Sequence, residues 1–554
     1  MYRHSKDRYY VVGEGVFVSD KKTQQRFHRP SPEEERTSFR FSRLGPKGSG
    51  LAESLQMKLA EAMTADVPDA DQALPAGYTY LAQFVDHDLT MDATKIPLGS
   101  PATVDQLVQG RSPALDLDSL YGFGPRVQPQ FYVDGMRLKS GRTTGVPGTA
   151  QTLLDHDGAD LPRTGTGERQ RDRRQALIPD VRNDENLAVA QTHAMFIRFH
   201  NRVVDLLAPS TPSVNLFQRA RETVVRHYQW MLRTDFLPRL IDPDVVDDVF
   251  TNGRRFFEVR PGRNTDHRSA GFHDLVRDGH SPTMPIEFSV AAYRLGHSMV
   301  RESYQWNMVF RDGGLAPVAG TLPLLFQFSG TSGVLSPPPA TIADPDSGAF
   351  LRLPSNWIAD FRRLFDFTEA GRADLVAPGG ELNTIKRIDT LLVNPLRNLP
   401  PGSFDGRDQQ NAPHELNLAF RNLSRAGMVE LANGRQMAKL LRVPVLDPEA
   451  LLHGNGGSDL SGLTASERNA LVKNPPLWFY VLREAELAGG RLTGVGARIV
   501  AEAFHRAIDG SRTSILSRPH WWPDLGPDPD TFRMVDLLLV ACDGRADLLN
   551  PLGD

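Results

Sequence analysis

Tyr80-Leu-Ala-Gln-Phe-Val-Asp-His-Asp-Leu89 is an apolar stretch that carries one histidine between two aspartates. Its apolar residues recur at spacings of three and four, which predicts a helix. Adjacent side chains on a helix point about 100° apart, so Asp86, His87 and Asp88 can face three different partners. Burying these three groups is costly unless each finds a partner. The pattern therefore favours the edge of a metal or cofactor site, and a hydrogen-bonded structural histidine is the alternative.

The remaining sequence indicates a mainly α protein. At about 150 residues per domain, its 554 residues could form three or four domains, but one large helical fold around a cofactor would use the same length. Alternating strand patterns are few. Further helical patterns occur at Leu51–Met63, after an N-cap at Asn183-Asp184, and at Glu287–Glu302, Glu415–Arg425, Gly434–Leu441 and Gly494–Ile508. We predict an N-terminal arm at 1–50, one large domain at 51–520, and a C-terminal extension at 521–554 packed on that domain.

Composition excludes several functional classes. The net charge of −4 gives no basic excess for binding nucleic acid. Cys542 is the single cysteine, so internal disulfides and cysteine-based zinc or iron–sulfur sites are excluded. No apolar run is long enough to span a bilayer, and Met1 to Arg8 has no apolar signal core. We expect a cytoplasmic location, with export by a route that needs no signal as the alternative.

Two short patterns could bind ligands. Between Ser112 and Asp118 an oxygen-bearing side chain stands at nearly every second position, as hard cations such as Ca²⁺ require, and a solvated turn is the alternative. Arg182 and Glu185 are three residues apart and share a face, where a surface ion pair is the alternative. The charge-rich segment 141–174 is expected to be a solvated surface loop.

Gly296 precedes His297 in an apolar helical pattern. Glycine inside a helix costs about 1 kcal/mol relative to alanine, so it needs a reason. Either a flat ligand approaches closely or two helices cross tightly, and the sequence leaves both open. His193 and His200 lie on one stripe without a third ligand nearby, and we interpret both as structural.

These elements, in this order, resemble the peroxidase–cyclooxygenase superfamily, the animal-type haem peroxidases, and more narrowly its bacterial members. Any single motif is weak, but six in the right order are specific, and they extend from about residue 70 to about residue 515. The six segments are Pro75–Thr90, Leu115–Gly122, Arg182–Asn186, Phe196–Arg202, Tyr293–Ser298 and Arg421–Arg425, with Pro476–Tyr480 and Gly496–Glu502 as later similarities.

The resemblance implies a mainly α fold with few short strands around a buried haem b. Its distal residues would be the catalytic His87, Arg182 and Gln83. On the proximal side, His297 would bind the iron, Asn422 would accept the other ring N–H of His297, and Arg294 and Arg425 would face the haem propionates.

The resemblance also implies covalent haem links and a calcium site. Asp86 and Glu185 match the carboxylates that esterify haem in the mammalian enzymes. Calcium would bind Asp88, Ser112, the carbonyl of Ala114, Asp116 and Asp118. Asn186 stands where myeloperoxidase-type enzymes have the methionine of a sulfonium link, so that link is excluded. Ser112 and Asp118 replace the commoner Thr and Ser, and both still supply oxygen.

The implied activity is reduction of hydrogen peroxide, through a ferryl intermediate, with electrons from a small donor such as a halide, thiocyanate or a phenol. A fatty-acid dioxygenase of the same superfamily is one alternative. Such enzymes have a radical-carrying tyrosine three residues before the proximal histidine, where this chain has Arg294, and Tyr293 lies four before. A non-catalytic interaction module is the other alternative, but it would be expected to lose His87, Arg182 or His297.

Overall fold

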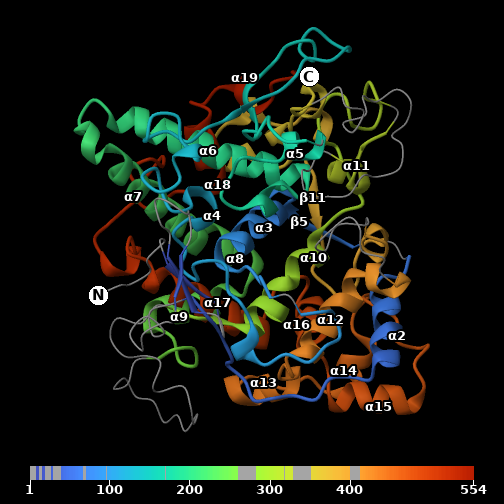
Figure 1. Cartoon of the computed structure of the whole chain (residues 1–554). Coiled ribbons are helices and arrows are strands. Elements are labelled where there is room, and N and C mark those ends of the chain that lie inside the picture. The colour runs from blue at the N-terminus through green and yellow to red at the C-terminus, as the bar shows by residue number, and fades with distance from the viewer. Residues whose placement is uncertain are drawn as a thin grey trace.

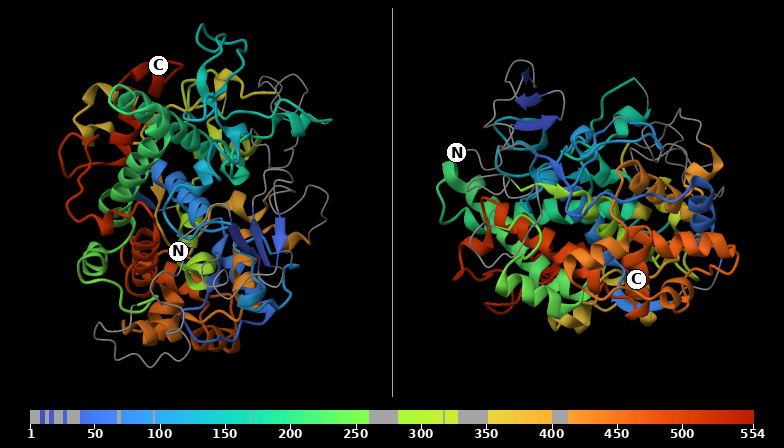
Figure 2. Two further views of the ribbon diagram at one scale, coloured as in Figure 1. Left: turned by 60° about the vertical axis from the view of Figure 1, so that its left-hand side comes forward. Right: turned by 90° about the horizontal axis from the view of Figure 1, so that it is seen from below.

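The computed structural model describes residues 8–11, 15–18, 26–28, 39–66, 70–94, 96–168, 170–259, 282–316, 318–327, 351–399 and 412–554. Most of the predicted N-terminal arm at 1–50 lies outside the described residues. The only parts of it before residue 39 that are described are β1 (Arg8–Val11), β2 (Gly15–Val18) and β3 (Arg26–His28). These three strands form one antiparallel sheet that stands out from the helical body in the right-hand view of Figure 2.

The fold is mainly α, as predicted. The α-helices of the described residues are α2 (Glu53–Met63), α3 (Gly77–Leu89), α4 (Asp118–Tyr121), α5 (Gln170–Arg174), α6 (Leu187–Leu207), α7 (Ser213–Met231), α8 (Leu237–Leu240), α9 (Pro243–Asn252), α10 (Gly296–Met299), α11 (Leu322–Gln327), α12 (Leu418–Met428), α13 (Gly434–Leu441), α14 (Pro448–His453), α15 (Ala465–Lys473), α16 (Leu477–Leu487), α17 (Gly494–Gly510), α18 (Met534–Ala541) and α19 (Ala546–Leu549). The remaining strands are β4 (Phe41–Ser42), β5 (Asp71–Pro75), β6 (Gly141–Arg142), β7 (Asp157–Asp160), β8 (Met284–Pro285), β9 (Ser303–Tyr304), β10 (Gly320–Thr321) and β11 (Thr384–Lys386).

One hydrophobic core connects these helices. Its buried residues run from Phe41 to Leu552, so the last part of the chain shares the core with the rest. The long helices α6 and α7 pack together, and α3 packs against α6. Helix α18, which belongs to the C-terminal part of the chain, also packs against α6. In Figure 1, α3 lies near the centre of the molecule with α10 next to it, and those two elements contact each other.

A two-stranded sheet determines where α3 begins. β5 pairs with β11 in antiparallel register, with Thr384 opposite Pro75 and Lys386 opposite Asp71. Pro75 ends β5, and α3 begins two residues later at Gly77. A Cβ at Gly77 would lie 2.3 Å from the ring of Phe365, so only glycine allows the chain to turn this close to its neighbour.

Two helix predictions were wrong in detail. The N-cap of α6 is Asn186, whose side chain accepts a hydrogen bond from Val189 N, whereas Asn183 lies in the preceding 3₁₀ turn η3 (Val181–Asp184). The pattern at 287–302 does not form one helix. It consists of a π-helical turn η5 (Glu287–Ala291), a 3₁₀ turn η6 (Ala292–Leu295) and the short α10, because the backbone of Ala291 leaves helical values at φ −133° and ψ −76°.

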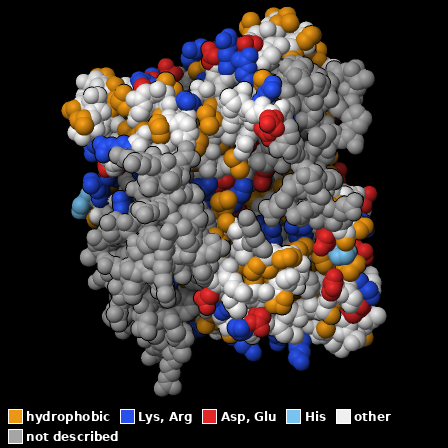
Figure 3. All heavy atoms as spheres, viewed as in Figure 1, with side chains coloured by type: hydrophobic (Ala, Val, Ile, Leu, Met, Phe, Trp, Pro, Cys, Tyr) orange, Lys and Arg blue, Asp and Glu red, His pale blue; other side chains and the backbone are white. Residues whose placement is uncertain are grey.

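The outer surface mixes charges of both signs. On the face drawn in Figure 3, Lys and Arg side chains are interspersed with Asp and Glu, and no basic field of the kind that binds nucleic acid is visible there. Within the part of the chain that the structure describes, no helix combines the length and the apolar character needed to cross a membrane.

Candidate functional site

Helix α3 has one accessible face inside an otherwise buried element. Gln83 and Asp86, three residues apart, keep partial solvent access, while His87 is 4% exposed and Asp88 is fully buried. A spacing of three residues places Gln83 and Asp86 on the same side of the helix. α3 therefore presents two polar groups to an accessible space and carries His87 at the edge of that space.

His87 is oriented by Asn183, which the sequence pattern indicated only as a helix N-cap. Its Nδ1 lies 2.9 Å from Oδ1 of Asn183, and because a carbonyl oxygen can only accept, Nδ1 carries the proton. Nε2 of His87 is then unprotonated in the neutral ring, and it lies 3.6 Å from Oε1 of Glu185. Gln83 also donates to Oε1 of Glu185 and accepts from Nδ2 of Asn186 at 2.9 Å.

Arg182 is fixed next to His87 by a residue that sequence reasoning missed. Its Nη2 donates to the carbonyls of His87 at 3.1 Å and Thr90 at 2.7 Å, and its side chain also pairs with Asp180 at 2.7 Å. Arg111 binds the same carboxylate at 2.7 Å. Burial on its own raises the pKa of Asp180, but Arg111 and Arg182 outweigh it and hold that pKa well below its usual range.

On the proximal side, His297 pairs with Asn422 of α12 as predicted, but in the opposite sense. Nδ2 of Asn422 lies 2.9 Å from Nδ1 of His297, so here the amide donates rather than accepts. Without a ligand on Nε2, either ring nitrogen can carry the proton, and either amide orientation makes one bond. Burial lowers the pKa of His297 to about 3, with Arg294 and Arg425 adding to the effect, so the imidazole is neutral.

The surroundings of His297 fit a flat cofactor. A Cβ added to Gly296 would meet nothing within 4 Å, so of the two alternatives the tight helix crossing is excluded and the space beside Gly296 is open. Arg294 donates to the carbonyl of Ser289 at 2.9 Å, and it lies near enough to His297 to affect the pKa of that imidazole. A neutral imidazole beside open space and two arginines is a donor set suited to haem iron and its propionates.

The segment that resembles a calcium loop is buried next to α3. Ser112, Ala114, Asp116 and Asp118 are each at most 4% exposed. The carboxylate of Asp88 accepts hydrogen bonds from the backbone N–H groups of Leu117 at 3.1 Å and Ser119 at 3.3 Å. Leu117 adopts a left-handed conformation at φ 59°, so the segment turns at this residue.

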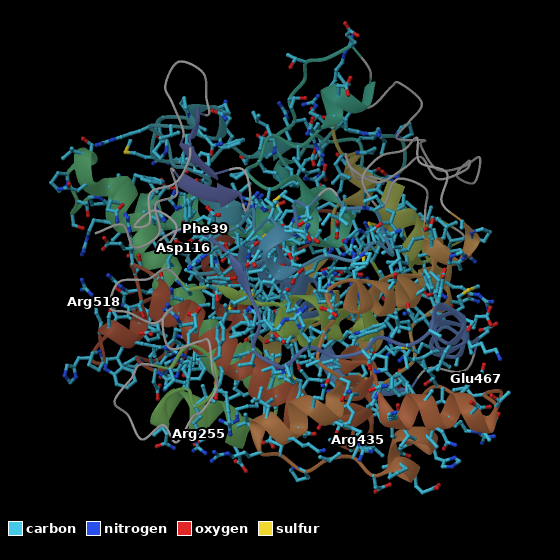
Figure 4. All side chains as sticks on the ribbon, turned by 60° about the horizontal axis from the view of Figure 1, so that its bottom comes forward. Phe39, Asp116, Arg255, Arg435, Glu467 and Arg518 are labelled. Carbon is cyan, nitrogen blue, oxygen red and sulfur yellow. The ribbon has the colours of Figure 1, made fainter. Side chains whose placement is uncertain are left out.

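The oxygens of this segment are near one another but do not form a ready-made metal site. Among the described residues, no group of three or more His, Cys, Asp or Glu side chains is placed to hold a metal ion. Asp118 faces Arg111 at 3.8 Å, and Asp116 faces Arg221 at 4.0 Å. In Figure 4, Asp116 lies on the opposite side of the molecule from Glu467 of α15.

The two histidines of α6 differ from each other. His200 is bonded at both ring nitrogens, to Tyr121 Oη and to the carbonyl of Met136, each at 2.9 Å, as a structural histidine should be. His193 is also fully buried, but neither of its ring nitrogens has a hydrogen-bond partner within the described part of the chain.

A separate cavity of about 400 Å³, lined among others by Gln56, His414 and Ser424, lies on a different face of α12 from Asn422.

Comparison with known proteins shows which proteins this chain is similar to. The profile of the animal haem peroxidase family matches residues 58–314. A peroxidase-like protein from Margaritifera margaritifera is 34% identical over 126 residues, which are 22% of this chain and 14% of that protein. The chain thus matches only about a seventh of the length of that relative.

Two solved structures share the overall fold. Peroxidase A from Dictyostelium discoideum superposes with a TM-score of 0.51 at 15% identity, covering 91% of this chain and 92% of that one. The fatty acid alpha-dioxygenase of Oryza sativa superposes with a TM-score of 0.50 at 12% identity, covering 92% and 80%. Both likenesses concern the fold, and they do not separate peroxidases from dioxygenases.

Proposed function

The chain belongs to the peroxidase–cyclooxygenase superfamily, and from that premise we propose that it is a haem peroxidase that reduces hydrogen peroxide with electrons from a small donor. The observation that carries the proposal is the pair of oriented histidines. His87 on α3 is bonded to Asn183, and His297 on the contacting element α10 is bonded to Asn422. Open space at Gly296 adjoins the second of them.

Haem, when bound, would supply the iron at which the peroxide bond is cleaved and the electrons for that reaction, which the small donor would later replace. His297 would hold the iron through Nε2. That arrangement leaves the proton on Nδ1, so the amide of Asn422 would turn its oxygen toward the ring. Arg294 and Arg425 would face the propionates.

On the distal side, the residues move a proton and stabilise charge. Because Asn183 fixes the Nδ1–H of His87, Nε2 is the basic nitrogen, and it would take a proton from one peroxide oxygen and return it to the other. Nη2 of Arg182 is engaged with backbone carbonyls, which orients the guanidinium to stabilise negative charge as the O–O bond breaks. Gln83 would complete the cavity wall.

We further propose calcium and ester links as the finer features of the site. Calcium would bind oxygens of Asp88, Ser112, Ala114, Asp116 and Asp118, whose burial and oxygen chemistry suit a hard cation. The present bonds of Asp88 to backbone N–H groups would have to rearrange. Binding would offset the cost of burying the carboxylates of Asp88 on α3 and of Asp116 and Asp118 in the neighbouring segment.

The ester links would form at two accessible carboxylates. Asp86 on α3 and Glu185, directly after η3, are only partly buried, so both can reach a haem edge. Acid–acetone extraction tests this proposal, since ester-linked haem stays with the protein and free haem leaves it. Complete extraction would exclude the links without affecting the assignment of a peroxidase.

A dioxygenase is not favoured by any residue at the site. Arg294 occupies the position three residues before His297, and Tyr293 is stacked on Phe288 with ring centroids 4.7 Å apart. The substrate test is direct. Purified protein supplied with haem and peroxide should oxidise halides, thiocyanate or phenols and should leave a long-chain fatty acid unchanged.

The proposed function is tested by absorption spectroscopy of haem-loaded protein. We expect a Soret band that shifts on addition of hydrogen peroxide, and we expect His297→Ala to lose haem or activity. His453→Ala is the matched control, because the side chain of His453 is 70% exposed and remote from the site. Failure of the wild-type protein to take up haem, or a fully active His297→Ala variant, would refute the proposal.

A further inference from the structure

The short helix that carries His297 cannot by itself fix the position of the His297 side chain. α10 has four residues, Gly296–Met299, and follows a π-helical turn and a 3₁₀ turn, so it lacks the repeated backbone bonds of a longer helix. A Cβ added to Gly296 would have no atom within 4 Å, so no neighbouring element packs against the helix at this position. Contacts from other parts of the chain must therefore hold His297 in place.

The residue after His297 makes such a contact. Ser298 is fully buried, and its hydroxyl donates to the carbonyl of Asp389 at 2.8 Å while accepting from the N–H of Asp389 at 2.9 Å. Both backbone groups of one residue thus bind one side-chain oxygen. These two bonds fix the backbone of the residue that follows His297.

The turn that receives Ser298 is itself rigid. Nζ of Lys386 lies 2.6 Å from Oδ1 of Asp389, and these two side chains are 0% and 1% exposed. The same Oδ1 accepts from the N–H of Leu391 at 2.8 Å, and Arg387 lies 3.3 Å from Oδ2. An ion pair removed from water in this way holds only when its geometry is well defined, which constrains the turn.

The same short segment also holds the start of α3. The carbonyl of Asn383 accepts a hydrogen bond from the N–H of Ala76 at 2.8 Å, and β11 pairs with β5 immediately before α3. Arg301, two residues beyond α10, donates to the carbonyls of Thr384 and Ile385 at 2.9 Å each. Residues 383–391 therefore contact both the helix of His87 and the turn of His297.

We propose that residues 383–391 form a spacer that sets the separation between α3 and the turn of His297, and that Ser298 is the positioning residue through which this spacer orients His297. The inference rests on the proposed function, since a fixed separation matters only if a cofactor lies between the side chains of His87 and His297. Ser298 contacts neither the cofactor nor a substrate and acts through the backbone of His297.

The test compares Ser298→Ala with a matched change elsewhere. Ser355 is equally buried, and its hydroxyl donates to the carbonyl of Leu154, so Ser355→Ala removes a similar bond away from the site. Each variant is loaded with haem, and we measure the ferric electron paramagnetic resonance spectrum and the rate of haem release to an excess of an apo-globin. We expect Ser298→Ala to broaden the spectrum and to release haem about fivefold faster, as loss of one buried hydrogen bond predicts. Ser355→Ala should match wild type in both.

A second pair of variants keeps the test decisive if Ser298→Ala does not fold. Ser298→Thr and Ser298→Val have the same shape and differ by the hydroxyl, so Thr should retain the wild-type spectrum and Val should not. Equal behaviour of Thr and Val, or a Ser298→Ala variant indistinguishable from wild type, would overturn the inference alone. A wild-type protein that binds no haem would instead overturn the proposed function, so the two failures are distinguishable.

Discussion

Asp180 connects the charge network of the distal side, and its removal gives the sharpest test of the geometry. Its carboxylate is 1% exposed and bonds Arg111 and Arg182 at 2.7 Å each. Asp180→Asn keeps the shape but removes the buried counter-charge shared by Arg111 and Arg182, whose side chains are 12% and 25% exposed. Breaking a buried pair from one side costs about 3–5 kcal/mol, so we expect a loss of about 3 kcal/mol in the free energy of unfolding at pH 7.

The pH dependence of this loss has a definite sign. The folded pKa of Asp180 is depressed, so its stabilisation is present above the unfolded pKa of about 3.9 and is lost as the pH falls further. The difference between wild type and Asp180→Asn should be constant above about pH 5 and should shrink below about pH 4. Urea unfolding of the two proteins at several pH values measures it.

The control for this prediction is an aspartate in an exposed pair. Asp547 bonds Arg545 at the surface, with the two side chains 64% and 58% exposed, so Asp547→Asn should leave stability unchanged. In haem-loaded protein, Asp180→Asn should also slow the reaction with peroxide by about tenfold, because Arg182 loses its orientation. An Asp180→Asn variant as stable as wild type at pH 7 would show that the network is wrongly assigned. A difference in the free energy of unfolding that stays the same below about pH 4 would show this too.

Three further changes have defined outcomes. Gly296→Ala should take up haem normally, because its Cβ meets nothing within 4 Å. Gly296→Leu should fill this space and lower the Soret absorbance per protein. Equal haem uptake by the two variants would show that the cofactor does not occupy the space beside Gly296. Burial raises the pKa of Glu484 to about 8, so the free energy of unfolding of wild type should fall relative to that of Glu484→Gln as the pH rises from about 4.5 through 8. Urea unfolding at several pH values measures this difference. A difference that does not change with pH would contradict the prediction. A calcium chelator should lower the melting temperature of wild type but not of Asp88→Asn; no effect on wild type would exclude calcium.

Local sequence patterns were sufficient where a helix is defined by its own spacing and ends. The pattern at Gly434–Leu441 gave both ends of α13, and the pattern from Gly494 gave the start of α17. α3 was recognised from its apolar spacing, although it begins three residues earlier than the Tyr80 end of that stretch. In each case the information lies within about one helical turn of the residue concerned.

The sequence did not distinguish two asparagines with the same chemistry. Asn183 and Asn186 can each cap a helix, and the caps differ only through their distant partners. Oδ1 of Asn183 is taken by His87, 96 residues away, which leaves Asn186 to cap α6. A choice made by a long-range contact is invisible to a pattern that reads neighbouring positions.

The charge-rich segment 141–174 shows the same limit. It was interpreted as a solvated face, and parts of it are exposed, but Arg163 is buried between Asp160 at 2.6 Å and Asp184 at 2.5 Å. Asp184 lies in η3, next to the residue that orients His87. The prediction was wrong here because the number of charges in a segment does not reveal a partner 21 positions away.

The residues assigned to the cofactor share a physical property that follows from the fold. Gln83, Asp86, Glu185 and His297 are partly accessible, although the elements that carry them are largely buried. Protein interiors are normally packed as densely as organic crystals, so space left open beside buried helices costs stability unless a ligand fills it. A bound cofactor should therefore stabilise the protein beyond the strength of its single iron bond. A haem-loaded protein that melts at the same temperature as the haem-free protein would contradict this account of the site.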